Sequence, residues 1–119
     1  MIAIIDYDAG NLTSVKRAVS HLGIECMITK EKAEIEAAER IIFPGVGAAG
    51  AAMQSLQRYG LDRAIKAALL AGKPVLGICI GSQIILAHSE ENDTPCLGIL
   101  DGTVRSFPSV NRSEDGQKL

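Results

Sequence analysis

The sequence predicts an α/β fold with three layers, in which a mostly parallel sheet carries helices on both faces. Two features lead to this prediction. Short apolar runs rich in β-branched residues alternate along the 119-residue chain with segments whose apolar residues recur at helical spacing. Glycine or proline separates many of these segments, and neither a repeat nor a linker divides residues 1–107, so a single domain is expected there.

The first elements follow from local patterns. Residues 2–5 form an apolar run that ends at Asp6, which is typical of a buried parallel strand. Apolar residues then recur at helical spacing over residues 12–22, and Gly23 ends that helix. The later expected elements, in chain order, are a strand over 24–29, a helix over 30–38, a strand over 41–43, helices over 48–58 and 61–71, a strand over 75–78, a helix over 80–88, and a strand or hairpin over 97–107.

Composition and charge exclude several classes of protein. The net charge is −2 and no basic stripe is present, which argues against nucleic-acid binding. Apolar stretches are interrupted well short of a membrane span. Three cysteines without framework spacing indicate reduced thiols and a cytoplasmic location. No residues have the spacing of metal ligands, and we expect neither a metal nor a cofactor. Residues 108–119 form a polar tail for which we expect poor order.

The strongest motif is Gly77-Ile78-Cys79-Ile80-Gly81, a nucleophile flanked by glycines between a predicted strand and a predicted helix. A sharp strand-to-helix turn strains the central residue and exposes its side chain, and the glycines allow the strand and the helix to approach closely. A helix N-terminus also favours a thiolate. The alternative is a buried, inert cysteine, which is the interpretation that we prefer for Cys26 in its apolar strand. Cys96 lies in an expected loop after Pro95 with no helix behind it, so we do not expect it to be a nucleophile.

A glycine-rich turn, Pro44-Gly45-Val46-Gly47, follows the third expected strand. Attack of a thiolate on an amide carbonyl builds negative charge on oxygen, and preorganised N–H groups must stabilise that charge. The turn can bring one backbone amide to the nucleophile, and the amide of Ile80 can be the second donor. The alternative is an ordinary turn at the end of a strand.

Together with Asp6-Tyr7 and Gly10-Asn11-Leu12, these motifs resemble the class I glutamine amidotransferases, which have a flavodoxin-like α/β fold. Within them, the order and spacing are most similar to the family of glutaminase subunits of imidazole glycerol phosphate synthase. The resemblance runs from residue 1 to about residue 107. It implies hydrolysis of glutamine to glutamate and ammonia, and delivery of the ammonia to a (β/α)8-barrel cyclase partner in histidine biosynthesis.

The resemblance also implies roles for individual residues. Cys79 matches the nucleophile that forms a glutamyl thioester. Gly47 and Ile80 match the region of the oxyanion amides. The residues implied in substrate binding are Gly45, Val46, Gln83 and Glu91, with Glu90 as the alternative to Glu91, and Asn11 matches the loop that faces the partner.

The chain departs from the family pattern at three positions. Asp8 stands where the family has glycine, Ala49 replaces an aromatic residue, and Ser82 replaces methionine. The resemblance also implies a catalytic His and Glu from the C-terminal part of the domain, beyond Leu119.

His88, on the same expected helix as Cys79 and about 13 Å farther along its axis, should not reach the thiol, and His21 should end the first helix. We therefore expect a truncated chain with little glutaminase activity alone. Its sheet edge should be uncovered, leading to self-association or marginal stability.

Two alternatives remain open at this point. The chain can belong to a different class I amidotransferase or a related cysteine hydrolase, which the residues after Leu119 would decide. It can also be a binding or regulatory module without catalysis. Selective labelling of Cys79 over Cys26 and Cys96 by a glutamine-like electrophile would favour the enzyme.

Overall fold

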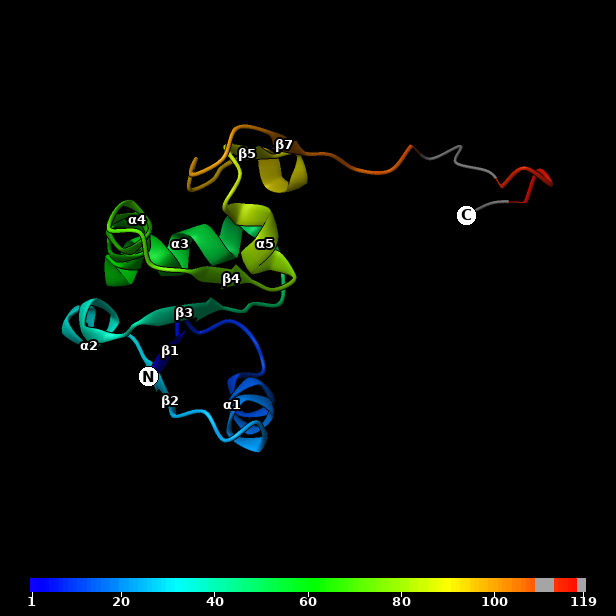
Figure 1. Ribbon diagram of the computed structural model, residues 1–119. Coiled ribbons are helices and arrows are strands. Elements are labelled where there is room, and N and C mark those ends of the chain that lie inside the picture. Colours follow the sequence, from blue (N-terminus) through cyan, green and yellow to red (C-terminus); the bar gives the residue numbers. More distant parts are fainter. Residues whose placement is uncertain (109–112, 118–119) are drawn as a thin grey trace.

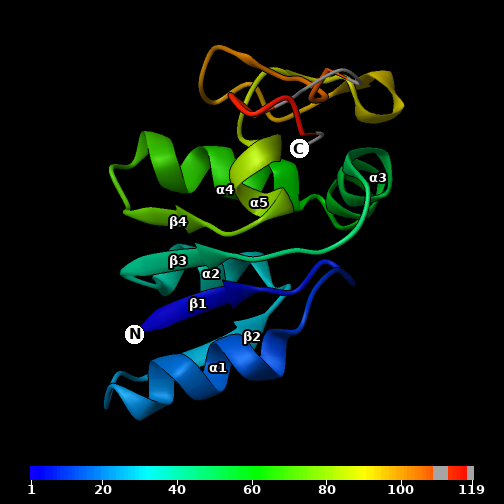
Figure 2. The ribbon, with the colours of Figure 1, turned by 90° about the vertical axis from the view of Figure 1, so that its right-hand side faces the viewer.

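The computed structural model describes residues 1–108 and 113–117, and it confirms the predicted α/β fold. A parallel sheet of four strands has the order β2-β1-β3-β4. The strands are β1 (Ile2–Ile5), β2 (Cys26–Thr29), β3 (Arg40–Phe43) and β4 (Val75–Gly77). Figure 2 shows them side by side, with their carboxyl ends directed toward the same end of the molecule.

Helices cover both faces of this sheet, as predicted. Figure 1 shows α1 and α2 on opposite sides of β1 and β2. The helices are α1 (Leu12–His21), α2 (Lys32–Ala37), α3 (Ala49–Tyr59), α4 (Leu61–Leu70) and α5 (Ile80–Ile84). None of the helices within the described residues combines the length and the apolar character needed to cross a bilayer.

Two apolar clusters follow from the alternation of side chains along the strands. On one face, Ile4 of β1 packs with Val19 of α1 and Ile42 of β3. On the other face, Ile5 and Phe43 belong to the larger cluster, which also contains buried residues of the helices α2 to α5. The larger cluster supports the end of β4 from which the predicted nucleophile projects.

The helix predicted over residues 80–88 ends earlier, at Ile84, and His88 lies instead in the short strand β5 (His88–Ser89). The reason is a cap supplied from far along the sequence. The carbonyls of Ile84 and Ile85 accept hydrogen bonds from the amides of Leu97 and Ile99, at 2.8 and 2.9 Å. These partners satisfy groups that another helical turn would otherwise use, so the helix stops after five residues.

Of the strand or hairpin predicted over residues 97–107, a short strand forms at residues 103–104, and the hairpin around residues 101–102 does not. Residues 97–100 cap α5, and β7 (Thr103–Val104) pairs in parallel with β5. A second strand, β6 (Thr94–Pro95), is antiparallel to β5 and follows a 3₁₀ turn, η1 (Glu91–Asp93). Figure 2 shows this small sheet beyond α5, on the β4 side of the molecule. The expected polar tail, residues 108–119, lies partly outside the described residues.

The β4 edge of the main sheet is open over the described residues, since β4 pairs there with β3 alone. The α1 face is also incompletely covered near this edge, because α1 packs over β1 and β2. A groove of 470 Å³ results, and Leu76 and Ile78, which are 57% and 39% exposed, help to line it. An apolar face beside an unpaired strand favours association.

We therefore expect the chain to self-associate through this groove. Leu76→Lys should weaken the association, because a charge that enters an apolar contact loses its hydration. Sedimentation velocity over a range of concentrations measures the effect. Leu70→Lys is the matched control, since Leu70 is 90% exposed at the end of α4. A wild-type chain that remains monomeric at high concentration would contradict this expectation.

Candidate active site

Cys79 occupies the strained turn that the sequence motif predicts. Its backbone has φ 56° and ψ −120°, and it immediately precedes α5 with an exposed side chain. Such a conformation is costly for any residue with a Cβ atom, and residues of this kind concentrate at functional sites. Hydrogen bonds on both sides hold it: the amide of Ile78 donates to the carbonyl of Phe43, and the amide of Ser82 donates to the carbonyl of Cys79, both at 3.0 Å.

The two flanking glycines are required by close packing. A Cβ atom on Gly81 would lie 2.0 Å from the carbonyl oxygen of Phe43, and one on Gly77 would lie 2.9 Å from the Cα of Ser82. Both obstacles are backbone atoms, which cannot move aside as a flexible side chain can. The motif therefore encodes the approach of β3, β4 and α5, and it leaves the thiol of Cys79 at the surface.

A cavity of 380 Å³ opens beside this thiol. Five predicted site residues meet there, since Cys79, Gly47, Ile80, Gln83 and Glu91 all line it. The other lining residues come from the small sheet and the segment that follows it: Ser89, Val104, Arg105, Ser106 and Phe107. Sequence reasoning missed this second group, because no local motif marks those positions.

The turn 44–47 contributes to the cavity through one residue only. Gly47, with φ 100°, lines the wall, whereas Gly45 is buried and Val46 is 59% exposed without lining the cavity. A Cβ on Gly45 would lie 1.8 Å from the hydroxyl oxygen of Tyr7 and 2.3 Å from Cγ2 of Ile80. Gly45 therefore packs closely against Tyr7, which follows β1, and against Ile80, the first residue of α5. Its predicted contact with substrate stays untested.

Tyr7 is a residue of this region that sequence reasoning did not assign. It is fully buried, and its hydroxyl finds no hydrogen-bond partner among the residues that the structure describes. Its ring packs on Phe43 with the centroids 5.2 Å apart. Burial, together with the nearby negative charge of a Cys79 thiolate, raises the pKa of Tyr7 far above its usual range. The hydroxyl therefore remains neutral beneath the turn at residues 44–47.

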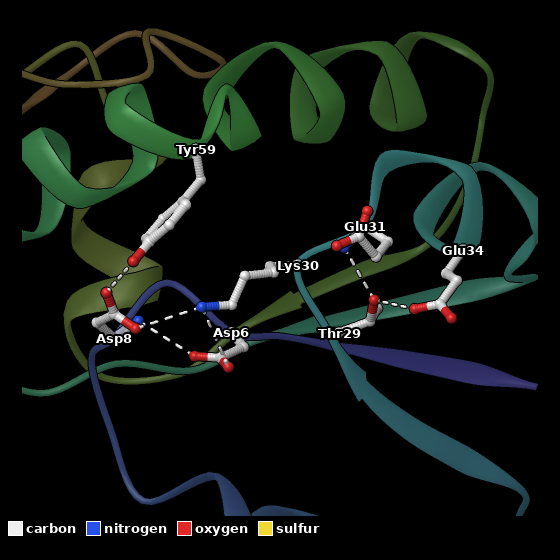
Figure 3. Close-up of polar contacts among 7 residues, drawn as sticks. All are labelled: Asp6, Asp8, Thr29, Lys30, Glu31, Glu34 and Tyr59. Carbon is white, nitrogen blue, oxygen red and sulfur yellow. Dashed lines mark hydrogen bonds and ion pairs between the residues drawn. The ribbon is translucent and has the colours of Figure 1, made fainter.

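Asp8, where the resemblance implies a glycine, also has a left-handed backbone, with φ 63°. Figure 3 shows how its carboxylate is held. It accepts a hydrogen bond from the hydroxyl of Tyr59, and Lys30 Nζ lies 3.6 Å from Asp8 Oδ1 and 3.9 Å from Asp6 Oδ2. The Tyr59 hydrogen bond and the Lys30 charge hold the pKa of Asp8 below its usual range. This Asp8 clamp fixes the loop after β1 against the end of α3.

The loop after β1 ends at Asn11, the residue predicted to face a partner. Asn11 is exposed, and its side-chain oxygen accepts a hydrogen bond from the amide of Ser14 at 3.3 Å, which caps α1. A partner-facing role for Asn11 stays a prediction, because the cap alone explains the residue type.

The other cysteines and the histidines lie elsewhere. Cys26 is half-buried in β2, and burial raises the pKa of the half-buried Cys96. His88 is not on the helix of Cys79, and its Nε2 lies 2.8 Å from Asp93 Oδ1. His21 is the last residue of α1, as expected. Among residues 1–108 and 113–117, no group of three or more His, Cys, Asp or Glu could hold a metal ion.

Comparison with known proteins places this geometry in a family. The profile of the family described as "Glutamine amidotransferase class-I" matches residues 3–106. The chain belongs to the class I glutamine amidotransferase family. A solved structure described as a glutamine amidotransferase is similar in fold, with a TM-score of 0.73, 22% identity, and coverage of 88% of this chain and 56% of the other.

Curated relatives within this amidotransferase family share more of the sequence. Imidazole glycerol phosphate synthase subunit HisH from Nitratidesulfovibrio vulgaris (strain Miyazaki F) is 56% identical over all 119 residues, which are 56% of its own length. The subunit of the same name from Listeria monocytogenes is 46% identical over 109 residues, covering 91% of this chain and 52% of the relative. The chain thus spans about half the length of the curated relatives it matches.

The packing at Gly81 gives a first prediction for the site. Gly81→Ala should destabilise the fold by about 1–3 kcal/mol and slow alkylation of Cys79, because the new methyl group meets the Phe43 carbonyl. Gly72→Ala is the control: Gly72 has φ 82° but open space, so only about 1 kcal/mol of backbone strain is expected there. Chemical denaturation measures both, and equal losses would contradict the steric argument.

The Tyr7 hydroxyl gives a second prediction. Tyr7→Phe should leave stability at neutral pH unchanged or raise it by about 1 kcal/mol, because it removes a buried donor without a partner. Because folding raises the pKa of Tyr7, wild-type stability should fall as the pH rises above about 10, where the unfolded chain ionises and the folded chain resists ionisation. Denaturation between about pH 8 and 11 should show a shallower decline for Tyr7→Phe. A loss of stability at neutral pH would contradict the absence of a partner.

Proposed function

We propose that the chain carries the nucleophile and much of the glutamine site of a glutaminase that releases ammonia through a thioester at Cys79. The observation that carries this proposal is the strained, exposed Cys79 between two glycines, opening into the cavity that Gly47, Gln83 and Glu91 also line. Membership of the class I amidotransferase family supports it, because an activated thiol in this turn suits acyl transfer from an amide.

The chemistry proceeds in two steps. The Cys79 thiolate attacks the side-chain amide carbon of glutamine, the carbonyl oxygen takes up negative charge, and collapse expels ammonia after protonation of the leaving nitrogen. Water then attacks the glutamyl thioester, releasing glutamate and restoring the thiol. The amides of Ile80 and of the Gly47 segment are the proposed donors to the oxyanion in both steps.

The remaining walls of the cavity suit the two ends of the substrate. Gln83, one turn beyond the nucleophile, supplies an amide, and Glu91 supplies a negative charge for the α-ammonium group. Gly45 and Val46 are proposed to act through the position of the turn that ends at Gly47. A His and Glu pair from outside these 119 residues is required to accept and return the proton, so little turnover is expected from the chain alone.

The names of the relatives extend the proposal to a pathway. Relatives 45–56% identical to this chain carry the name of imidazole glycerol phosphate synthase subunit HisH. We infer that the ammonia passes to a (β/α)8-barrel cyclase partner in the cytoplasm, in histidine biosynthesis, with the Asn11 loop facing that partner. The identity to these subunits favours this assignment over another class I amidotransferase.

The proposal is tested by covalent labelling. A chloroketone analogue of glutamine, with the α-amino and α-carboxylate groups of the substrate, should alkylate Cys79 faster than Cys26 or Cys96. Neutral chloroacetamide supplies the reference rate at each thiol, and mass spectrometry of peptides measures both reagents. Excess glutamine should protect Cys79 from the chloroketone, and Cys79→Ser should abolish the selective adduct. Equal labelling of the three thiols, without protection, would favour a binding module and overturn the proposal.

A further inference from the structure

The helix α3 begins directly after the turn that brings Gly47 to the cavity, yet it has no cap of its own. Ala48, at the N-cap position, has an extended backbone and no side-chain acceptor. Two residues far along the chain replace it. The amide of Ala49 donates to Glu91 Oε2 at 3.0 Å, and the amide of Gly50 donates to Asn92 Oδ1 at 3.3 Å. We call this pair of acceptors, Glu91 and Asn92, the remote cap.

The segment that carries the remote cap is held by several hydrogen bonds. Asn92 and Asp93 have φ values of 58° and 45°, a left-handed backbone that Asn and Asp adopt more readily than other residues with a Cβ atom. Within the turn, the amide of Glu91 donates to the hydroxyl of the buried Ser89 at 3.2 Å, and the hydroxyl of Thr94 donates to the carbonyl of Glu91 at 2.9 Å. These bonds fix the turn from which the side chains of Glu91 and Asn92 reach the first amides of α3.

The fit at Gly50 supports the same conclusion. A Cβ atom there would lie 3.1 Å from Asn92 Oδ1, so the absence of a side chain lets the Asn92 amide approach the helix. The remote cap also joins two parts of the proposed glutamine site. Glu91 lines the cavity with Gly47 and Cys79, whereas Asn92 does not. Asn92 can therefore influence the site only indirectly, through α3 and the turn before it or through its neighbour Glu91.

We propose that the remote cap sets the position of the turn at residues 44–48 relative to Cys79, with Asn92 as a positioning residue and Glu91 linking the cap to the substrate. This inference rests on the proposed glutaminase function. Glu91 Oε2 accepts the amide of Ala49, and the other carboxylate oxygen remains for the α-ammonium group of glutamine. Binding of the α-ammonium group orders the same carboxylate that accepts the first amide of α3. A change at the amine site therefore changes the position of the turn at residues 44–48.

The test uses the full 119-residue chain and two chloroketones, one with and one without the α-amino group of glutamine. Each rate at Cys79 is divided by the chloroacetamide rate, which corrects for access to the thiol. Asn92→Ala should lower both ratios about tenfold, because a displaced turn stabilises the ketone oxygen less well. Asn92→Asp should restore them, since a carboxylate accepts the same hydrogen bond and suits a helix N-terminus. Rescue by Asp shows that the accepting oxygen is what matters, and the stability control below separates positioning of the turn from a general loss of stability.

Glu91→Gln separates the two roles of Glu91. The glutamine oxygen can still accept the amide of Ala49, so reaction with the chloroketone that lacks the amino group should be unchanged. Reaction with the amino-bearing reagent should fall, because the negative charge is gone. Gln57→Gly, at an exposed position of α3, serves as the stability control, since glycine weakens the helix without touching the cap.

Three outcomes would overturn the inference. The first is that Asn92→Ala lowers the melting temperature but leaves both rate ratios at the wild-type value. The second is that Asn92→Ala lowers the two rate ratios no more than Gln57→Gly does at an equal loss of stability. The third is that the chloroketones show no selectivity for Cys79 even in the wild-type chain, which would overturn the proposed function together with the role of the remote cap. If the wild-type chain is selective and the ratios of Asn92→Ala are unchanged, only the role of the remote cap is overturned.

Discussion

The carbonyl group of Phe43 governs the geometry of this site. It ends β3, accepts the amide of Ile78 beyond β4, and lies where Gly81 passes without a side chain. The turn that leads to Gly47 begins at this peptide group, and the strand-to-helix turn that carries Cys79 packs against it. Neither segment can shift at this point without disturbing that contact, so backbone packing fixes where the two segments meet, and the remote cap acts on the far end of the turn, where α3 begins.

The walls of the cavity are built differently from its floor. Cys79 and Ile80 stand on the parallel sheet and the larger apolar cluster, whereas Ser89 of β5, Glu91 of η1 and the residues after β7 belong to the small unit whose strands have only two residues each. Hydrogen bonds across long stretches of sequence hold this second part, as the cap of α5 by residues 97–100 shows. The reactive group is thus fixed by the core, and recognition of the substrate depends on a smaller and less buried unit.

Local patterns were sufficient to predict the sheet, most helices and the elbow, because each depends on residues within a few positions. The end of α5 could not be predicted, since amides 13 or more residues away decide it. The remote contact between Glu91 and Ala49 was hidden for the same reason. Tyr7 lies two residues beyond the last residue of β1, yet it belongs to the same apolar cluster as Ile5, so extending the strand alternation past Asp6 would have indicated its burial. The positive φ of Asp8 is consistent with the glycine that the resemblance implied at this position.

The Asp8 clamp makes the order of sequence change matter. Glycine at position 8 would adopt the left-handed backbone without cost, and it would leave the Tyr59 hydroxyl to bond water while Lys30 keeps its contact with Asp6. Loss of the Tyr59 hydroxyl first would instead leave a strained aspartate with one partner fewer. The effects of these two substitutions on the free energy of unfolding should therefore not add. Losing both residues costs less stability at each step when Asp8 is replaced first. A lineage that acquired aspartate at this position would tend to keep the tyrosine for as long as the acid remained.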